Sequence, residues 1–379
     1  MTGFLERLFA SLFWSAVIKV VFVFVFLLVV VLLLVWIERK LVADMQNRLG
    51  PMRAGPFGVL QTVADGLKLF IKESVIPAKV ELGVYLAAPV LAMVPAFLIF
   101  LVIPIRGPIT IGGTEVTMQG MDLNVGVLYI LAMSSLAVYA IVLAGWSSGS
   151  KYPLLGGVRA TAQMISYEAA MGLSLVPVVL LASHQIGAGS IGMGTMSLSK
   201  IVELQSGSFR DLFTIGDTVV GVPGWFVFWL IPSFIIFMIA AVAEANRAPF
   251  DLVEAETEIV GGFHTEYSGI RFALFFLAEY INMFNLSAIA VTLFFGGWLG
   301  PTFPGVLPGF LPALMPIFWF MLKTFVLLFG FIWLRATLPR LRYDQLMDLG
   351  WKRLIPASIA WLVLFTVVTA WKAWGVPWS

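Results

Sequence analysis

The densest group of ionisable side chains lies between Glu244 and Arg271. Only Arg247 and Arg271 balance the six acids of this stretch, which are Glu244, Asp251, Glu254, Glu256, Glu258 and Glu266. In a helix, Glu254 and Glu258 would share one face, where like charges repel and raise each other's pKa. Crowded or partly buried carboxylates can carry protons near the working pH, but a solvated acidic face that docks a basic partner would have the same composition. The pattern leaves both roles open.

Two further acids interrupt strongly apolar stretches. Glu168 lies in MISYEAAMGLSL and Glu279 lies in LAEYINMFN. A carboxylate is costly in hydrocarbon, so each should face the bundle interior, a cavity or a partner, with a hydrogen-bonded structural role as the alternative. Lys19 and Lys323 also fall within apolar stretches, and Lys19 is expected to snorkel toward the outer surface.

The segment 38–81 is more polar and more patterned than a simple connector requires. Residues 57–73 predict an amphipathic helix, because apolar and polar side chains form separate stripes with a 3.6-residue period. Asp65 and Lys68 could join Arg39 and Arg48 around a polar mouth below apolar walls, an arrangement that suits a quinone with its polar head and long apolar tail. An interfacial anchor with snorkelling lysines explains the same spacing.

The composition excludes a soluble globular protein. Of 379 residues, 60% are hydrophobic and 12% are charged. The apolar runs are about 20 residues or longer, as a membrane-spanning helix requires, and they lack the alternation of a membrane barrel. We predict an all-α integral membrane protein with a single polytopic domain over 1–379 and an amphipathic interfacial helix in the first inner loop. The eight expected spans are near 14–37, 82–103, 124–145, 160–182, 225–243, 272–297, 313–334 and 354–374.

The orientation follows from lysine and arginine. The loops after the first, third, fifth and seventh spans contain 16 of these residues, and the opposite side contains 5. Positive loops favour the cytoplasmic side. We therefore expect a multi-pass protein of the bacterial cytoplasmic (inner) membrane, with both termini on the outer, periplasmic side and the loops 38–81 and 244–271 inside.

Redox cofactors have few ligands in this chain. It has no cysteine, which excludes thiolate metal sites, cysteine-ligated iron–sulfur clusters and covalently attached haem. Its two histidines, His184 and His264, do not suggest a haem pair, so no metal is expected. Any redox chemistry must come from a partner or a diffusible ligand. The net charge of +2 identifies no partner, and none of these features indicates a nucleic acid.

Three ordered blocks carry a resemblance to a known family. They are IERK through KLFIKE at 37–73, VRATAQMISYE at 158–168, and AEANRAPFDL through FALFFLAEY at 243–280. With these blocks the chain resembles the H-type membrane subunits of respiratory complex I, the proton-pumping NADH:quinone oxidoreductase. The resemblance extends over essentially the whole chain.

The resemblance implies a non-redox subunit that forms the quinone-access tunnel where the membrane and hydrophilic arms meet, and that links quinone reduction to proton translocation. Carried over residue by residue, the quinone path would be lined by Arg39, Arg48, Asp65, Lys68 and Phe250. The coupling route would use Glu168, Glu244, Arg247, Asp251, Glu254, Glu256, Glu258, Glu266 and Glu279. No residue of this chain is expected to be catalytic by itself.

The resemblance also implies the partners. Quinone would be the substrate, whereas NADH, FMN and iron–sulfur clusters would be bound by hydrophilic quinone-site and iron–sulfur subunits. Small and antiporter-like membrane subunits and the lipid bilayer complete the expected surroundings.

Two alternatives remain. An equivalent subunit of a ferredoxin- or hydrogenase-linked energy-converting complex would share part of the acidic-loop motif, although the complete first block favours a quinone-reducing complex. A stand-alone ion transporter would explain the intramembrane acids, but the sequence shows no repeated pair of broken helices and its inner loops are unusually elaborate for that role.

Overall fold

The structure is a computed structural model that describes residues 12–373 except 112–113, 187–194, 216–217, 252–260 and 302–310. Seven helices in this described part are long and apolar enough to cross a membrane, and an eighth apolar helix is shorter. The long helices are α2 (Leu12–Met45), α4 (Leu82–Leu101), α5 (Gly126–Ser147), α6 (Lys151–Ile186), α10 (Ile270–Phe294), α11 (Leu311–Thr337) and α13 (Ile355–Ala373), and the shorter one is α8 (Ile231–Glu244). The predicted all-α integral membrane class is confirmed.

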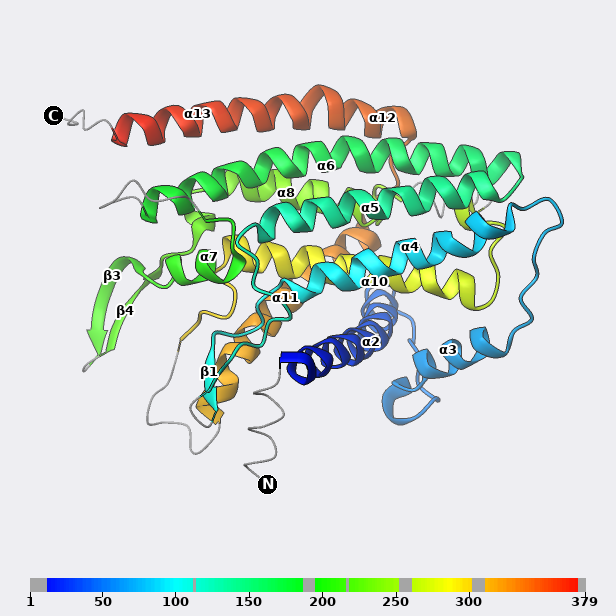
Figure 1. Cartoon of the computed structure of the whole chain (residues 1–379), viewed down its shortest axis with the longest axis horizontal. Helices are drawn as coiled ribbons and strands as arrows, with labels where there is room; N and C mark the ends of the chain where they lie inside the picture. Colours follow the sequence, from blue (N-terminus) through cyan, green and yellow to red (C-terminus); the bar gives the residue numbers. More distant parts are fainter. Residues whose placement is uncertain are drawn as a thin grey trace.

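Helix α10 forms the centre of the bundle. Helices α2, α4, α8 and α11 pack against it, and α2 is inclined to most of the bundle, so that it is strongly foreshortened in Figure 1. In the most apolar window of α10, 72% of the residues are buried, compared with 22% for α2 and 17% for α13. A helix that is buried on all sides needs apolar side chains around its whole circumference. Phe284 and Phe294 accordingly pack against Phe100 and Phe237 from neighbouring helices.

The connections gather at two opposite ends of the bundle. The α3 end contains α3 (Gln61–Ile71), the turn between α5 and α6, the described residues 245–251 and 261–269 with η3 (Gly262–His264), α12 (Tyr343–Asp348) and the π-helical turn η4 (Leu349–Leu354). The hairpin end contains the antiparallel pairs β1 (Ile109–Ile111) with β2 (Thr114–Val116) and β3 (Ser208–Ile215) with β4 (Thr218–Pro223), together with α7 (Leu198–Leu204) and η2 (Phe226–Phe228). This alternation agrees with the predicted grouping of inner and outer loops.

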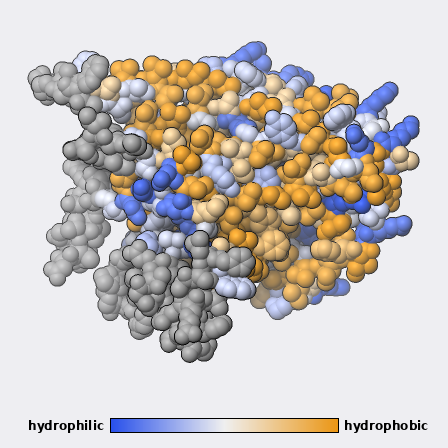
Figure 2. All heavy atoms as spheres, viewed as in Figure 1, coloured by the Kyte–Doolittle hydropathy of each residue, from blue (hydrophilic) through white to orange (hydrophobic). Residues whose placement is uncertain are grey.

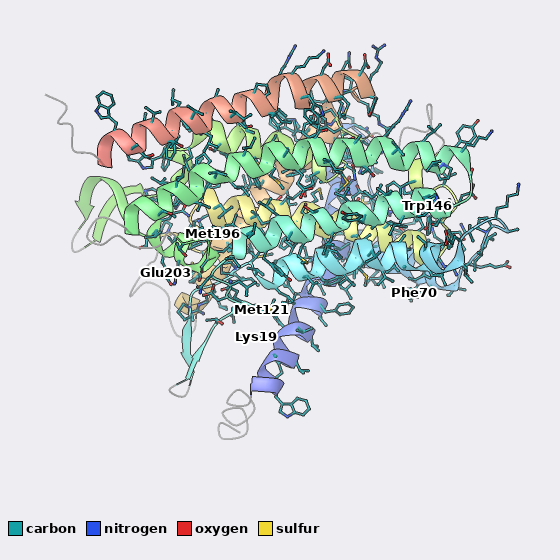
Figure 3. The ribbon with its side chains drawn as sticks, turned by 45° about the horizontal axis from the view of Figure 1, so that its top comes forward. Lys19, Phe70, Met121, Trp146, Met196 and Glu203 are labelled. Carbon is teal, nitrogen blue, oxygen red and sulfur yellow. The ribbon has the colours of Figure 1, made fainter. Side chains whose placement is uncertain are left out.

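A broad band of apolar surface lies between these two ends. Hydrophobic side chains dominate the face in Figure 2, and hydrophilic ones gather at the α3 end and in a second group near the hairpin end. Figure 3 shows Phe70 and Trp146 at the α3 end, and Met121, Met196 and Glu203 near the hairpin end. Trp146 is 60% exposed, as expected for an aromatic side chain at a membrane boundary.

The predicted amphipathic helix is α3. It follows the short 3-10 turn η1 (Pro56–Gly58), where Gly58 has a φ of +77° and a Cβ would lie 2.3 Å from the carbonyl oxygen of Pro51. Trp36 of α2 fixes this turn by donating from Nε1 to the carbonyl oxygen of Phe57 at 3.1 Å. The apolar stripe of α3 is left uncovered by the chain, with Leu67 and Ile71 exposed. This exposure agrees with a helix at a membrane or subunit boundary.

Both lysines within apolar stretches have polar partners. Lys19 donates to Thr117 Oγ1 at 3.2 Å near the hairpin end. The Nζ atom of Lys323 donates to the carbonyl oxygens of Phe295, Gly297 and Leu299, which follow the C-terminal end of α10. A cation is favourable there because the last carbonyls of a helix have no intrahelical donors.

Replacing Lys323 with methionine should destabilise the protein by roughly 1–3 kcal/mol, because buried carbonyls lose their donor. The unfolding temperature of the purified protein measures the loss. Lys352→Met is the matched control, since Lys352 is exposed and forms an i,i+4 pair with Asp348, which typically contributes under about 1 kcal/mol. Equal unfolding temperatures for the two variants would contradict this assignment.

Candidate functional site

A polar cavity at the α3 end has a volume of about 520 Å³. It lies where α2, α10 and α11 meet, and its size is within the range of small-molecule sites. Its lining residues are Val35, Glu38, Arg39, Val42, Ala43, Gln46, Arg48, Leu49, Gly50, Pro51, Phe276, Tyr280, Arg335 and Ala336. Charged groups and apolar walls therefore meet in one space, and we call it the large cavity.

Helix α3 is attached to this cavity by an ion pair. The Nη1 atom of Arg39 lies 2.6 Å from Asp65 Oδ2, and Lys68 Nζ lies 3.7 Å from Asp65 Oδ1. Partial burial alone would raise the pKa of Asp65, but the hydrogen bond and charge of Arg39 outweigh it and lower that pKa. Asp65 is thus held as an anion that orients Arg39 beside the cavity.

A buried ionic cluster forms the inner wall of the large cavity. Arg247 is 3% exposed, its Nη1 lies 3.3 Å from Glu38 Oε1, and its Nε lies 2.9 Å from Glu279 Oε1. Its guanidinium lies over the ring of Tyr280 at 4.2 Å, and Arg335 also pairs with Glu38. Burial alone would lower the pKa of Arg247, but the carboxylates of Glu279 and Glu38 outweigh it and raise that pKa. Arg247 is therefore a permanent cation between two acids.

A smaller cavity of about 50 Å³ lies on the other side of this cluster. Glu279 lines it together with Glu244, Asn246, Asp251 and His264. This volume is sufficient for a few water molecules, and the polar lining would bind them. Asp251 is buried at its edge and lies 3.4 Å from Arg340 Nη2. We call this space the acidic cavity.

Two adjacent serines of α5 connect the acidic cavity with the predicted intramembrane acid. Ser134 Oγ donates to Oε1 of the buried Glu244, and Ser135 Oγ donates to Oε1 of Glu168. Because the serines are neighbours in the chain, Glu244 on α8 and Glu168 on α6 lie on either side of one turn of α5. Glu168 is only partly buried, between the exposed side chains of Ile165 and Ala169. It thus lies near the surface of the bundle.

Gln163 of α6 holds the backbone at the start of the acidic segment, the stretch 244–271, in place. Its Nε2 atom donates to the carbonyl oxygens of Ala243 at 2.8 Å and Phe250 at 2.9 Å. The ring of Phe250 packs against Tyr167 at a centroid distance of 5.3 Å and does not line the large cavity. These contacts fix the start of the acidic segment against the bundle.

The other end of the acidic segment is tied to α4 and to the chain between α3 and α4. The rings of Tyr85 and Tyr267 stack at 4.2 Å, Tyr85 donates to the carbonyl oxygen of Glu266 at 2.8 Å, and Tyr267 donates to that of Tyr85 at 3.2 Å. Ser268 Oγ accepts from the amide of Val75 at 3.0 Å. Burial raises the pKa of Tyr267 to about 12, so its hydroxyl remains a donor. Residues 266–268 are therefore bound both to α4 and to the chain between α3 and α4.

The structure places nine of the fourteen predicted residues in the lining of these two cavities or beside it. Arg39 and Arg48 line the large cavity with Asp65 and Lys68 beside it, whereas Phe250 lies apart. The predicted coupling residues that lie along the acidic cavity or its partners are Glu168, Glu244, Arg247, Asp251 and Glu279. Glu266 contributes its backbone carbonyl to the tyrosine contact, and Glu254, Glu256 and Glu258 lie outside the described residues.

Sequence reasoning missed several members of the site. They are Glu38, Ser134, Ser135, Gln163, Tyr280 and Arg335. Glu38 carried the clearest signal, because it is an acid in the IERK block at the end of an apolar run. The two serines carried none, since serines are common in membrane helices and only the packing shows which of them meet carboxylates.

A family model described as NADH dehydrogenase matches residues 18–366. The chain belongs to this family. The match contains both cavities and the ionic cluster between them, so the site lies within the part of the chain that defines the family.

Two relatives extend this finding. A protein named as the H subunit of NADH-quinone oxidoreductase, from Frankia alni (strain DSM 45986 / CECT 9034 / ACN14a), is 51% identical over 352 residues, which are 93% of this chain and 72% of the relative. The protein of the same name from Frankia casuarinae (strain DSM 45818 / CECT 9043 / HFP020203 / CcI3) is 51% identical over 351 residues, again 93% of this chain and 72% of the relative. The family membership and the membrane fold agree with the resemblance seen in the three sequence blocks.

Proposed function

We propose that this chain is the subunit of an NADH:quinone oxidoreductase that receives quinone at the α3 end and links its reduction to proton movement in the membrane. Other subunits of such a complex would hold NADH, FMN and iron–sulfur clusters, because this chain has no cysteine to bind a cluster. Antiporter-like and small membrane subunits would receive the effect of quinone reduction. In this proposal the α3 end faces the cytoplasm of a bacterium and the termini face the periplasm, as the lysine and arginine distribution favours.

The observation that carries the proposal is the continuity of charged groups from one cavity to the other. Glu38 lines the large cavity and pairs with Arg247, which pairs with Glu279, which lines the acidic cavity. Quinone reduction requires protons and changes the local charge. Arg247 would respond to such a change on either side, because it is buried and weakly screened between two carboxylates.

The large cavity suits the head of a quinone. Arg39, Arg48 and Arg335 place donors around it, and the apolar side chains of Leu49 and Phe276 face the same space. Asp65 orients Arg39 through the 2.6 Å ion pair. Lys68 is exposed beside Asp65 and adds positive charge at the mouth.

The coupling step would use the carboxylates beyond Arg247. A change of charge at Glu279 would act on Glu244, which lines the same acidic cavity. Ser134, the partner of Glu244, is next to Ser135, which donates to Glu168. Glu168 lies near the bundle surface, where a neighbouring membrane subunit could receive the proton or the charge displacement. Glu254, Glu256, Glu258 and Glu266 remain predicted members of the same route.

A photoreactive quinone analogue tests the first half of the proposal. In membranes that contain the whole complex, illumination should label peptides that include Glu38–Pro51 or Arg335, and excess quinone should suppress this labelling. Arg39→Leu should reduce the labelling several-fold because the cavity loses a donor near the head group.

The chain offers an internal control for this experiment. A second cavity of about 570 Å³ lies at the hairpin end, lined by Trp225, Trp319 and Val326, and it is more apolar than the large cavity. Simple partitioning of the analogue would label this hairpin-end cavity equally or better. Competition by quinone that is confined to the hairpin-end cavity would overturn the proposed quinone site.

A further inference from the structure

Two buried oxygen atoms face a third, very small cavity and have no donor among the described residues. Oε2 of Glu244 and Oδ1 of Asn285 are both fully inaccessible and without a hydrogen-bond partner. Both residues line a space of about 20 Å³ between α5, α6, α8 and α10. Asn285 is 1% exposed and Glu244 is 8% exposed, so solvent at the membrane surface does not supply the missing donor. A buried acceptor without a donor is costly and uncommon in native proteins.

The orientation of the Asn285 amide is fixed by its other contact. Its Nδ2 atom donates to the carbonyl oxygen of Ala96 on α4 at 2.7 Å. A carbonyl oxygen can only accept, so this contact assigns the nitrogen and leaves Oδ1 as the unpartnered acceptor. On Glu244, the donor Ser134 occupies Oε1 and leaves Oε2. The two unpartnered atoms are therefore both acceptors, and neither can satisfy the other when Glu244 is ionised.

We infer that one water molecule is bound between Glu244 and Asn285, and that Asn285 is the residue that positions it. A single water has two hydrogens and can donate to both oxygens at once, and a space of about 20 Å³ exceeds the roughly 10–15 Å³ that a water needs. Ser134 and Asn282 are the other polar residues of the lining, and the rest of the walls are apolar, with Ile99, Phe237 and Ile289 among them, which restricts the water to the polar side. The site thus selects a small molecule that can donate two hydrogen bonds.

The water extends the hydrated region of the protein toward the hairpin end. Ala137, Met164, Glu244 and Asn282 line both this space and the acidic cavity, so the two spaces adjoin at Glu244. The bound water can accept a proton from the carboxyl group of Glu244 through its oxygen, and it can return that proton to the same carboxylate. Asn285 thereby gives Glu244 a proton partner on the side opposite the acidic cavity. This part of the inference rests on the proposed proton role of the acidic cavity.

The first test is a density map of the purified whole complex at a resolution that shows ordered waters. We expect a density peak within hydrogen-bonding distance of both Glu244 Oε2 and Asn285 Oδ1. Asn285→Leu should remove the peak, because it removes the acceptor and fills the space. An empty site in the unmodified complex, in a map that shows other buried waters, would overturn the inference whatever the function of the protein.

The second test measures protons pumped per NADH oxidised in vesicles that contain the complex. Asn285→Leu should lower this ratio several-fold, whereas Asn285→Ser should retain most of it, because a hydroxyl and a second water can replace the amide. Both variants lose the contact with Ala96, so the comparison separates positioning of water from helix packing. Ser287→Ala is the matched control, since Ser287 is equally buried on α10 but donates only to Met283 of its own helix. A normal ratio in Asn285→Leu, or an equal loss in both Asn285 variants, would overturn the role of Asn285 in positioning the water. Whether the water is bound at all is decided by the density map.

Discussion

Replacing Arg247 with leucine should destabilise the subunit by about 3–5 kcal/mol and abolish quinone reduction. The physical reason is that Glu279 would lose the guanidinium that pairs with it, and the buried Glu38 would be left with its pairing to Arg335. Removing one partner of a buried ion pair is much more damaging than removing an exposed one, because the remaining charge has lost its water and its partner. The amount of assembled complex after mild extraction, and its NADH:quinone activity, measure the two effects.

Three companion variants define the cause. Arg342→Leu removes an arginine whose side chain is 72% exposed and paired with Asp344 at 2.7 Å, so it should cost under about 1 kcal/mol. Arg247→Lys keeps a charge but loses the planar guanidinium that contacts both acids and the Tyr280 ring, so an intermediate loss is expected. Adding Glu279→Gln to Arg247→Leu should restore part of the assembly by removing one unbalanced carboxylate. Normal assembly of Arg247→Leu alone would contradict the cluster as described.

Replacing Glu244 with glutamine should lower proton pumping by roughly 10²-fold while the complex still assembles. Glutamine has nearly the same shape, and its Oε1 can still accept the hydrogen bond from Ser134, but it cannot carry a proton. The variant should therefore lose proton pumping without losing stability, which would not occur if Glu244 were only a structural residue. The rate of acidification in NADH-energised vesicles, divided by the amount of assembled complex, gives the effect.

The control for Glu244 is an acid at the opposite end of the bundle. Glu203 is exposed on α7 near the hairpin end, and Glu203→Gln should pump normally. Ser134→Ala should lower pumping in the same direction as Glu244→Gln but to a smaller extent, because the carboxylate remains. Pumping at the normal rate in Glu244→Gln would exclude this carboxylate from the proton pathway.

The sequence was sufficient for the membrane fold because apolar length is a one-dimensional property. Runs such as 14–37 and 272–297 predicted spanning helices directly, and the separate stripes of 57–73 predicted α3. The hairpins β1–β2 and β3–β4 were not predicted, since short strands in connecting loops have no comparable periodic signal.

The site was predictable only where its residues were unusual for their surroundings. Glu168 and Glu279 stood out as acids in apolar runs, and both have polar or charged partners in the structure. Gln163 and Asn285 were overlooked because an uncharged polar residue in a membrane helix has many ordinary roles. Their importance depends on which atoms lack a partner, and only three-dimensional packing determines that.

The length of α2 gives the lipid bilayer an influence on the large cavity. The apolar part of α2, near 14–37, is about 36 Å long at about 1.5 Å per residue, whereas the hydrocarbon layer is about 30 Å thick. A helix longer than the membrane accommodates by tilting, and few contacts within the chain oppose a change of tilt, since only 22% of its apolar window is buried. Glu38 and Arg39 near its end would move with that tilt. Membranes of different thickness would thus change the position of these two residues in the large cavity, so lipid acyl-chain length becomes a physical variable of this protein.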